Sequence, residues 1–230
     1  QDPALREALG YAYDFEWLNK NIMFDQYSRT NSYFENSVMA AEGEPSEEEL
    51  AILEPYRDQL PSRVFGPAYK APVTDGSGRD REPLQTAKKI LEDAGWHVKN
   101  GKLINPHSGQ PLTIEFLMYD PNELRSTGPF IKNLKKLGIE ASARVVDSSQ
   151  YAERLRSYDF DITTVVLAQS ISPGNEQREF WGSAAGERPE SRNVMGINSP
   201  VIDALIENLI AAPTYEKLIP AVRALDRVLS

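Results

Sequence analysis

The chain has 230 residues, 40% of them hydrophobic, and its 34 acidic and 25 basic side chains give a net charge of −9, with no cysteine. The apolar fraction is too high for a disordered chain, and the lack of cysteine excludes disulfide scaffolds and cysteine-bound zinc. The negative charge argues against nucleic acid as a partner, and no apolar run approaches the roughly 20 residues that cross a bilayer.

The chain opens directly on a helical pattern. Asp2 is a good N-cap, Pro3 suits a first helical turn, and alanine and leucine side chains recur with helical spacing over residues 4–12. Asp14 is placed to cap a second helix that ends near Ile22. Because the start shows neither an initiator methionine nor a targeting segment, we expect the chain to be cut from a longer protein.

A loop, a capped helix and an extended connection come next. Residues 27–36 are polar and aromatic without a clear period, which indicates a loop. Ser46 and Glu49 form a capping box that begins a helix, and Pro61 is expected to end it. The prolines and glycines of residues 61–83 favour an extended surface connection.

Helices and strands then alternate. A helix over residues 84–94 is closed by Gly95, and Asn100-Gly101 is the preferred turn for a hairpin. The continuous apolar end of residues 160–168 is typical of a strand covered on both faces. The alternation predicts the α/β class. The strands are expected at 96–99, 102–104, 112–119, 139–146 and 160–168, and the further helices at 124–137, 147–158, 200–211 and 215–229.

Little in the sequence points to catalysis. The only histidines are His97 in the predicted hairpin and His107 in a turn, and there is no serine-nucleophile elbow, zinc-protease motif or phosphate loop. Asp159 and Asp161 stand two residues apart at a predicted strand start, where a carboxylate pair could form. A carboxylate-dependent hydrolase is therefore an alternative function.

Three polar loops look better suited to recognition. They are residues 119–122, 169–178 and 193–198, and the first two directly follow predicted strands. Ligands of open α/β sheets bind beyond the carboxyl ends of the strands. The loops supply hydrogen-bond donors and acceptors without a nucleophile–base pair, so we expect a binding surface, with no metal and no cofactor.

Five motifs in a consistent order resemble the solute-binding proteins of oligopeptide and dipeptide ABC importers, extracellular solute-binding protein family 5. The first is the pattern D-x-x-x-R-x-A-x-x-x-A-x-D at residues 2–14. The others lie at residues 87–96, 134–139, 151–161 and 198–206. The stretches from Arg29 to Phe34 and from Pro173 to Arg178 are similar to the YejA-like branch of this family.

The resemblance implies a type II periplasmic-binding-protein fold, with a mixed sheet flanked by helices. Residues 1–230 would form a single ligand-binding lobe, the second lobe of a two-lobed clamp whose first lobe is missing from this chain. The family further implies a periplasmic location, a peptide or peptide-like small solute, and delivery to ABC permease subunits in the inner membrane. The signal peptide or lipid anchor would lie on the missing segment.

One departure from the family concerns the solute. Several peptide-binding relatives carry an aspartate after the strand that ends here at Ala168, whereas this chain has Gln169 and no acid before Glu176. Anchoring of a free amine is therefore in doubt, and a modified peptide, an opine-like compound or a sugar conjugate is an alternative solute. The expected ligand contacts are hydrogen-bonding groups on Ser170, Ser172 and Asn175, a carboxylate fork at Arg178, flat walls at Tyr33 and Tyr119, and the loop residues Ile171 and Asn193.

A third function stays open beside solute binding and hydrolysis. The chain could be a sensory or protein-interaction module that shares the lobe fold and presents its cleft face to a protein partner. An exposed apolar patch at the cleft would favour this alternative.

Overall fold

The computed structural model describes residues 2–188 and 190–230, and its contacts divide the chain into two compact units. The first unit consists of Gln1–Arg29, Ala71–Ala152 and Phe160–Thr164, and the second of Thr30–Lys70, Glu153–Asp159 and Val165–Ser230. Each unit has a hydrophobic core of its own. The single lobe over residues 1–230 stays a prediction.

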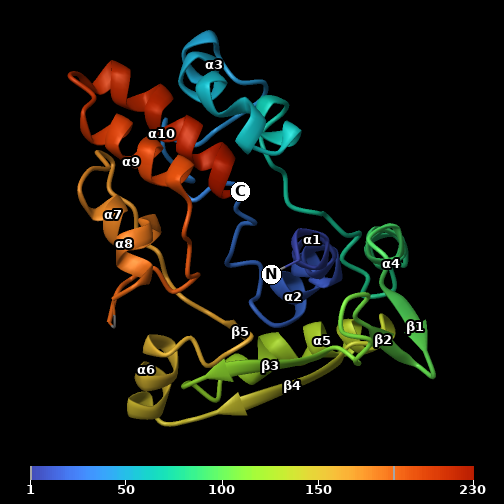
Figure 1. Cartoon of the computed structure of the whole chain (residues 1–230). Coiled ribbons are helices and arrows are strands. Elements are labelled where there is room, and N and C mark those ends of the chain that lie inside the picture. The colour runs from blue at the N-terminus through green and yellow to red at the C-terminus, as the bar shows by residue number, and fades with distance from the viewer. Residues whose placement is uncertain (1, 189) are drawn as a thin grey trace. The chain divides into compact units, whose positions relative to one another are not determined.

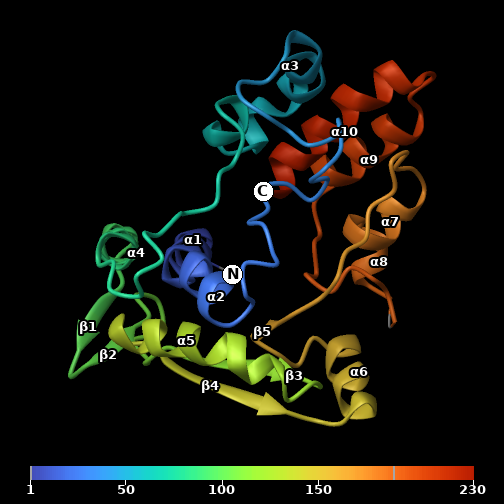
Figure 2. The same ribbon diagram turned by 180° about the vertical axis from the view of Figure 1, so that it is seen from behind.

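A three-stranded parallel sheet in the order β4-β3-β5 is central to the first unit (Figure 1). The strands are β3 (Thr113–Met118), β4 (Glu140–Val145) and β5 (Ile162–Thr163). β3 and β4 pair along their whole lengths, and α5 (Glu123–Lys136) links them and runs along one face of the sheet (Figures 1 and 2). This parallel pairing across a helix confirms the α/β class.

An antiparallel hairpin of β1 (His97–Lys99) and β2 (Lys102–Ile104) adjoins this sheet. Its turn residues Asn100 and Gly101 have φ values of 52° and 77°, as the predicted two-residue turn requires. The amide of Leu103 donates to the carbonyl of Gly138 at 2.8 Å. Gly138 has a φ of +82°, and a Cβ there would come within 2.9 Å of the Leu103 nitrogen, so only glycine fits this junction.

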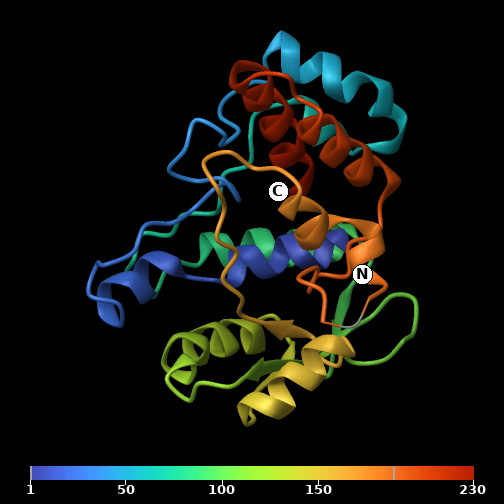
Figure 3. The same cartoon turned by 90° about the vertical axis from the view of Figure 1, so that its left-hand side faces the viewer.

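Three further helices belong to the first unit: α1 (Pro3–Ala12), α2 (Phe15–Asn21) and α4 (Glu82–Asp93). Their N-terminal chemistry agrees with the sequence, because Asp2 Oδ1 accepts from the amide of Ala4 at 2.9 Å and Asp14 caps α2. Asp2 Oδ2 also accepts from the indole of Trp96 at 2.7 Å, a hydrogen bond that lowers the pKa of Asp2. α1 packs beside α4 over this part of the core (Figure 3).

The strand predicted over residues 160–168 is wrong in length and in burial. β5 pairs with β3 only at Phe116 and Leu117, and Val166 is 87% exposed. Side chains occupy the positions that would extend the pairing, because Asp161 accepts from the amide of Glu115 at 2.8 Å. At the other end, the hydroxyl of Tyr151 donates to the carbonyl of Thr164 at 3.1 Å.

The second unit is helical, and its elements are α3 (Glu47–Leu53), α7 (Glu176–Trp181), α8 (Ser183–Gly186), α9 (Pro200–Ile210) and α10 (Tyr215–Leu229), with 3₁₀ helices at Glu54–Gln59 and Ser62–Phe65. α10 packs against both α9 and α3 (Figure 2). Ser46 caps α3 as predicted, but the α-helix ends at Leu53 instead of reaching Pro61. Pro55 explains the change to 3₁₀ geometry, because proline has no amide to donate within an α-helix.

Helix α6 (Ser148–Arg156) contributes residues to both units. Asp147 caps it as predicted, accepting from the amides of Ser149 and Gln150, both at 2.9 Å. Within residues 2–188 and 190–230, no helix is both long enough and apolar enough to cross a membrane.

Candidate functional site

Segment 169–178 of the second unit is anchored by a directed chain of hydrogen bonds. The indole of Trp181 donates to Oε1 of the fully buried Gln177 at 2.8 Å. Gln177 Nε2 in turn donates to Oε1 of Gln169 at 2.8 Å. Because an indole nitrogen only donates, it fixes the orientation of both amides. Nε2 of Gln169 therefore points away from this series of hydrogen bonds. It is buried and has no partner among the described residues.

An unmet donor at Gln169 has a definite chemical meaning. A buried donor without an acceptor costs roughly 1–3 kcal/mol, so such groups are rare in folded proteins. A carbonyl or carboxylate oxygen from outside the chain would remove this cost, whereas an ammonium group could not. The unmet group at the start of segment 169–178 is thus a donor, which an oxygen acceptor can satisfy and an ammonium group cannot.

The next three predicted residues form an exposed turn. Ser170 Oγ accepts from the amide of Ser172 at 3.0 Å, and the side chain of Ile171 projects outward with 79% exposure. The hydroxyl of Tyr215 donates to the carbonyl of Ile171 at 3.3 Å. The turn thus presents two serines and one apolar side chain beside the Gln169 amide.

Asn175 and Arg178 lie together at the start of α7. Arg178 Nη1 donates to Asn175 Oδ1 at 2.7 Å, and its Nε and Nη2 both donate to the carboxylate of Glu207 at 2.6 Å. These hydrogen bonds from Arg178 hold the pKa of Glu207 below its usual range. The predicted carboxylate fork is thus formed with a carboxylate of the chain itself.

Tyr33 also packs against Trp181. Its ring meets the indole edge-on, with centroids 4.9 Å apart and an angle of 67°. Its amide donates to Asp226 Oδ1 at 3.0 Å. Tyr33 therefore has the flat, fixed ring that a wall of a site needs, and Trp181 connects it to the amide chain of Gln177.

Asn193 lies in a buried position that differs from the other predicted contacts. Its amide nitrogen donates to the carbonyls of Gly182 and Ile197, at 3.0 and 2.8 Å, and its oxygen accepts from the amide of Ile197 at 2.9 Å. The residue is fully buried, and its carbonyl accepts from the hydroxyl of Tyr158 at 2.8 Å. Asn193 thus holds the loop at 193–198 in shape.

Tyr119 belongs to the first unit. It is 55% exposed and packs on Tyr151, with ring centroids 5.0 Å apart. Tyr151 is itself held by a hydrogen bond of 2.9 Å between its hydroxyl and that of Thr163. The predicted residues thus fall in both units, with Tyr119 in the first and the other seven in the second.

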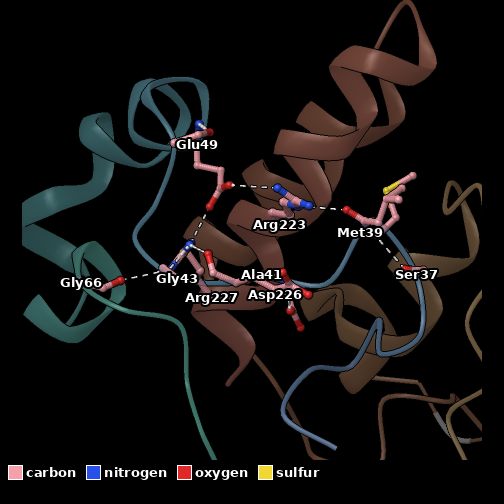
Figure 4. A network of polar contacts seen from close by, with 12 residues as sticks. Ser37, Met39, Ala41, Gly43, Glu49, Gly66, Arg223, Asp226 and Arg227 are labelled. Atoms are coloured by element: carbon pink, nitrogen blue, oxygen red, sulfur yellow. Dashed lines mark hydrogen bonds and ion pairs between the residues drawn. The ribbon is translucent and has the colours of Figure 1, made fainter.

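A buried polar network surrounds Asp226 and Arg227 near the end of α10 (Figure 4). Asp226 accepts from the amides of Tyr33 and Ala41, at 3.0 and 2.9 Å. Burial raises the pKa of Asp226, while hydrogen bonds from Ser32 and from these amides oppose the rise. Arg227 pairs with the buried carboxylate of Glu49 and donates to backbone carbonyls that include Gly66, at 3.0 Å.

The carboxylates considered for hydrolysis already have partners. Asp161 accepts from the Glu115 amide, and Asp159 forms an ion pair with Arg154 at 2.9 Å. They belong to different units of the chain. In the described part of the chain, no three histidine, aspartate or glutamate side chains are grouped to hold a metal ion.

Two features of the structure were not foreseen in the sequence. Gln177 stands four residues before Trp181 on one helix face, a spacing that brings side chains into contact and could have signalled the amide chain. Arg29 was noticed only as the start of a branch motif. In the structure its guanidinium lies 5.1 Å from the ring centroid of Tyr13 and 5.5 Å from that of Phe15.

The fold is that of a periplasmic-binding protein. The oligopeptide-binding protein AppA from Bacillus subtilis, solved in complex with a nonapeptide, matches with a TM-score of 0.69 at 18% identity, covering 98% of this chain and 39% of AppA. Residues 1–188 match the family "Bacterial extracellular solute-binding proteins, family 5 Middle". The chain belongs to this family of solute-binding proteins.

Two relatives place the chain near the YejA proteins. The "Probable peptide-binding protein YejA" of Agrobacterium fabrum (strain C58) is 44% identical over 229 residues, which is 100% of this chain and 37% of the relative. The "Uncharacterized protein YejA" of Escherichia coli K12 is 42% identical over 230 residues, 100% of this chain and 38% of the relative. The chain thus spans well under half the length of these relatives.

Proposed function

We propose that this chain is one ligand-binding lobe of a periplasmic receptor that captures peptide-like solutes for an ABC importer. A second lobe of the same protein closes over the solute, and permease subunits in the inner membrane receive it. The observation that carries this proposal is the 44% identity, along the whole chain, to a protein named for peptide binding. The receptor binds its solute without changing it.

The arrangement around segment 169–178 supports a binding role. Ser170, Ser172 and the Gln169 amide offer hydrogen bonds, Ile171 offers an apolar contact, and Tyr33 offers a flat wall. In the first unit, Tyr119 stays a predicted aromatic contact of the solute. Asn175 and Arg178 reach the solute only if it competes with Glu207 for the guanidinium, and Asn193 acts by holding its loop.

Calorimetry on the full-length receptor tests the proposal. Titration with short peptides such as tri-alanine is expected to give saturable binding, and the peptide is expected to be recovered intact. The 230-residue chain alone is expected to bind far more weakly, because the contacts of the closing lobe are missing. Equal affinity of the two proteins, or peptide turnover, would overturn the proposal.

A paired substitution tests the predicted turn. Ser170→Ala together with Ser172→Ala is expected to weaken peptide binding several-fold by removing two hydroxyl groups at the site. Ser77→Ala is the matched control, because Ser77 Oγ accepts from the amide of Arg79 at 3.0 Å, as Ser170 Oγ does from Ser172. Equal losses in both variants would mean that the serines act on loop structure alone.

A further inference from the structure

β4 (Glu140–Val145) is an edge strand of the first unit, because its sheet runs in the order β4-β3-β5 (Figures 1 and 2). The amide of Glu140 donates to the carbonyl of Leu112 at 3.3 Å, so Glu140 directs its backbone groups toward β3. The backbone groups of successive strand residues point to alternate sides. Those of Ala141, Ala143 and Val145 therefore point away from β3, toward the free side of β4.

These outward groups are ready to pair with another strand. In the described part of the chain, β4 pairs with β3 alone, and no hydrogen bond joins the backbone of Ala141, Ala143 or Val145 to a further element. The strand has six residues without proline or glycine, and all six are in register with β3. A regular edge of this length suits the addition of a strand from another molecule.

The side chains of β4 are self-complementary in charge. Glu140, Ser142 and Arg144 alternate along one exposed face, with the acid and the base equally far from the serine. The side chains of Glu140 and Arg144 are 62% and 61% exposed. If two copies of β4 pair antiparallel with Ser142 at the centre, each Glu140 stands opposite Arg144 of the other copy. This is a non-hydrogen-bonded position, where cross-strand side chains lie closest, because the outward backbone groups belong to the alternate residues.

Charges next to β4 extend this complementarity. The carboxylate of Glu140 lies 3.2 Å from the ammonium of Lys102, and the guanidinium of Arg144 lies 3.7 Å from the carboxylate of Glu115. These exposed ion pairs contribute little by themselves. In the paired strands they form one row of alternating sign, from Lys102 and Glu140 of one copy to Arg144 and Glu115 of the other. The two-fold symmetry of such a pairing repeats the row a second time.

We propose that two copies of this chain form a symmetric dimer by antiparallel pairing of β4, with each Glu140 opposite Arg144 of the second copy. The pairing joins two three-stranded sheets into one sheet of six strands. β5, at the other edge, has only two residues, so the assembly ends with two copies. Because the contact is confined to one edge strand, the dimer is weak and depends on protein concentration. The inference is independent of the proposed solute.

Sedimentation velocity of the 230-residue chain over a dilution series tests the dimer. The wild type is expected to pass reversibly from monomer to dimer as its concentration rises. Glu140→Arg and Arg144→Glu are each expected to weaken dimerisation about 10-fold or more, because two attractive cross-strand pairs become repulsive. The double variant is expected to restore the dimer, since acid and base only exchange places. An equimolar mixture of the two single variants is expected to form a mixed dimer, in which every arginine meets a glutamate.

Lys89→Glu is the matched control, because it changes the net charge as Arg144→Glu does and disturbs an exposed ion pair of α4, with Asp93 at 2.9 Å. It is expected to leave dimerisation unchanged. Ala143→Pro removes an outward amide and is expected to abolish the dimer. Thermal unfolding checks that each variant is folded, and the charge variants decide if Ala143→Pro is not.

Three results would each overturn the proposal. The first is a wild-type chain that stays monomeric up to the highest soluble concentration. The second is a dimer that forms equally well in Glu140→Arg and Arg144→Glu. The third is a loss of dimerisation in these variants that neither the double variant nor the mixture restores.

Discussion

The C-terminal half of α10 and segment 169–181 both bury polar side chains in the second unit, but only one of them satisfies all of its groups. Arg227 is 4% exposed, pairs with Glu49, and donates to the carbonyls of Glu42, Gly43 and Gly66. Segment 169–181 ends its amide chain on a donor of Gln169 that has no partner among the described residues. The contrast separates a polar network whose groups are paired from one that ends on an unpaired donor.

The largest expected effect on stability comes from breaking the buried network around Arg227. Arg227→Met leaves the carboxylate of Glu49, which is 2% exposed, without its partner, and it should lower the free energy of unfolding by about 3–5 kcal/mol. Urea denaturation measures the loss. Arg188→Gln is the control, because its pair with Glu179 is 58% and 46% exposed and should contribute little. Equal stability of Arg227→Met and the wild type would show that the network is not structural.

A smaller effect on the free energy of unfolding is expected within the series of hydrogen bonds from Trp181 through Gln177 to Gln169. Gln177→Leu strands the buried indole nitrogen of Trp181 and should cost about 1–3 kcal/mol of unfolding free energy. Gln169→Leu removes a donor that is already unmet. It also removes an acceptor of Gln177 Nε2, but that nitrogen keeps the carboxylate of Glu176 at 3.3 Å. It should therefore cost less than Gln177→Leu and weaken solute binding. Urea denaturation and calorimetry separate the two quantities. A larger stability loss for Gln169→Leu would contradict the assignment of Gln169 to the site.

The smallest expected effect concerns pH. Burial raises the pKa of Asp226 above its usual value of 3.8, so the folded state favours the neutral carboxyl group. Its contribution to stability is therefore present below pH 3.8 and is lost as the pH rises through the raised pKa. Asp226→Asn carries no such titration. Urea denaturation measures the free energy of unfolding of both proteins. The value for the wild type should fall relative to that for Asp226→Asn as the pH rises from 3.5 to 7. A constant difference would reject the raised pKa.

Local chemistry made most of the fold predictable. Asp2, Ser46 and Asp147 act as helix caps within three residues of their own position, and Asn100-Gly101 encodes its turn in its backbone preferences. These interactions do not depend on distant parts of the chain. The ends of the helices predicted from them therefore agree with the structure, except where Pro55 changes α-helix into 3₁₀ helix.

The wrong predictions concern features that depend on contacts with residues distant in the sequence. The apolar pattern of residues 160–168 is strand-like, but pairing stops after Thr163. The reason is that the hydroxyl of Tyr151, on α6, donates to the carbonyl of Thr164. The complete burial of Asn193 was not predicted either, because it depends on carbonyls at Gly182 and Ile197. No periodicity in the sequence reports such contacts.

The candidate site was predictable as a region and not as a set of contacts. The serines of segment 169–178 stood out by composition, and the missing aspartate argued against anchoring of a free amine. The unmet donors could not be found in the sequence, because they are defined by the absence of a neighbour. Only the three-dimensional contacts show that Nε of Arg29 and Nε2 of Gln169 lack partners among the described residues.

The short pairing of β5 has a consequence for the behaviour of the molecule in solution. An open sheet edge is a template on which a strand of another copy can add, and natural proteins block it with charges turned inward and with brief edge strands. Here the carboxylate of Asp161 covers one backbone amide of β3, and Tyr151 covers a carbonyl just past β5. The side chains that shorten the strand thereby guard the chain against aggregation through its own sheet.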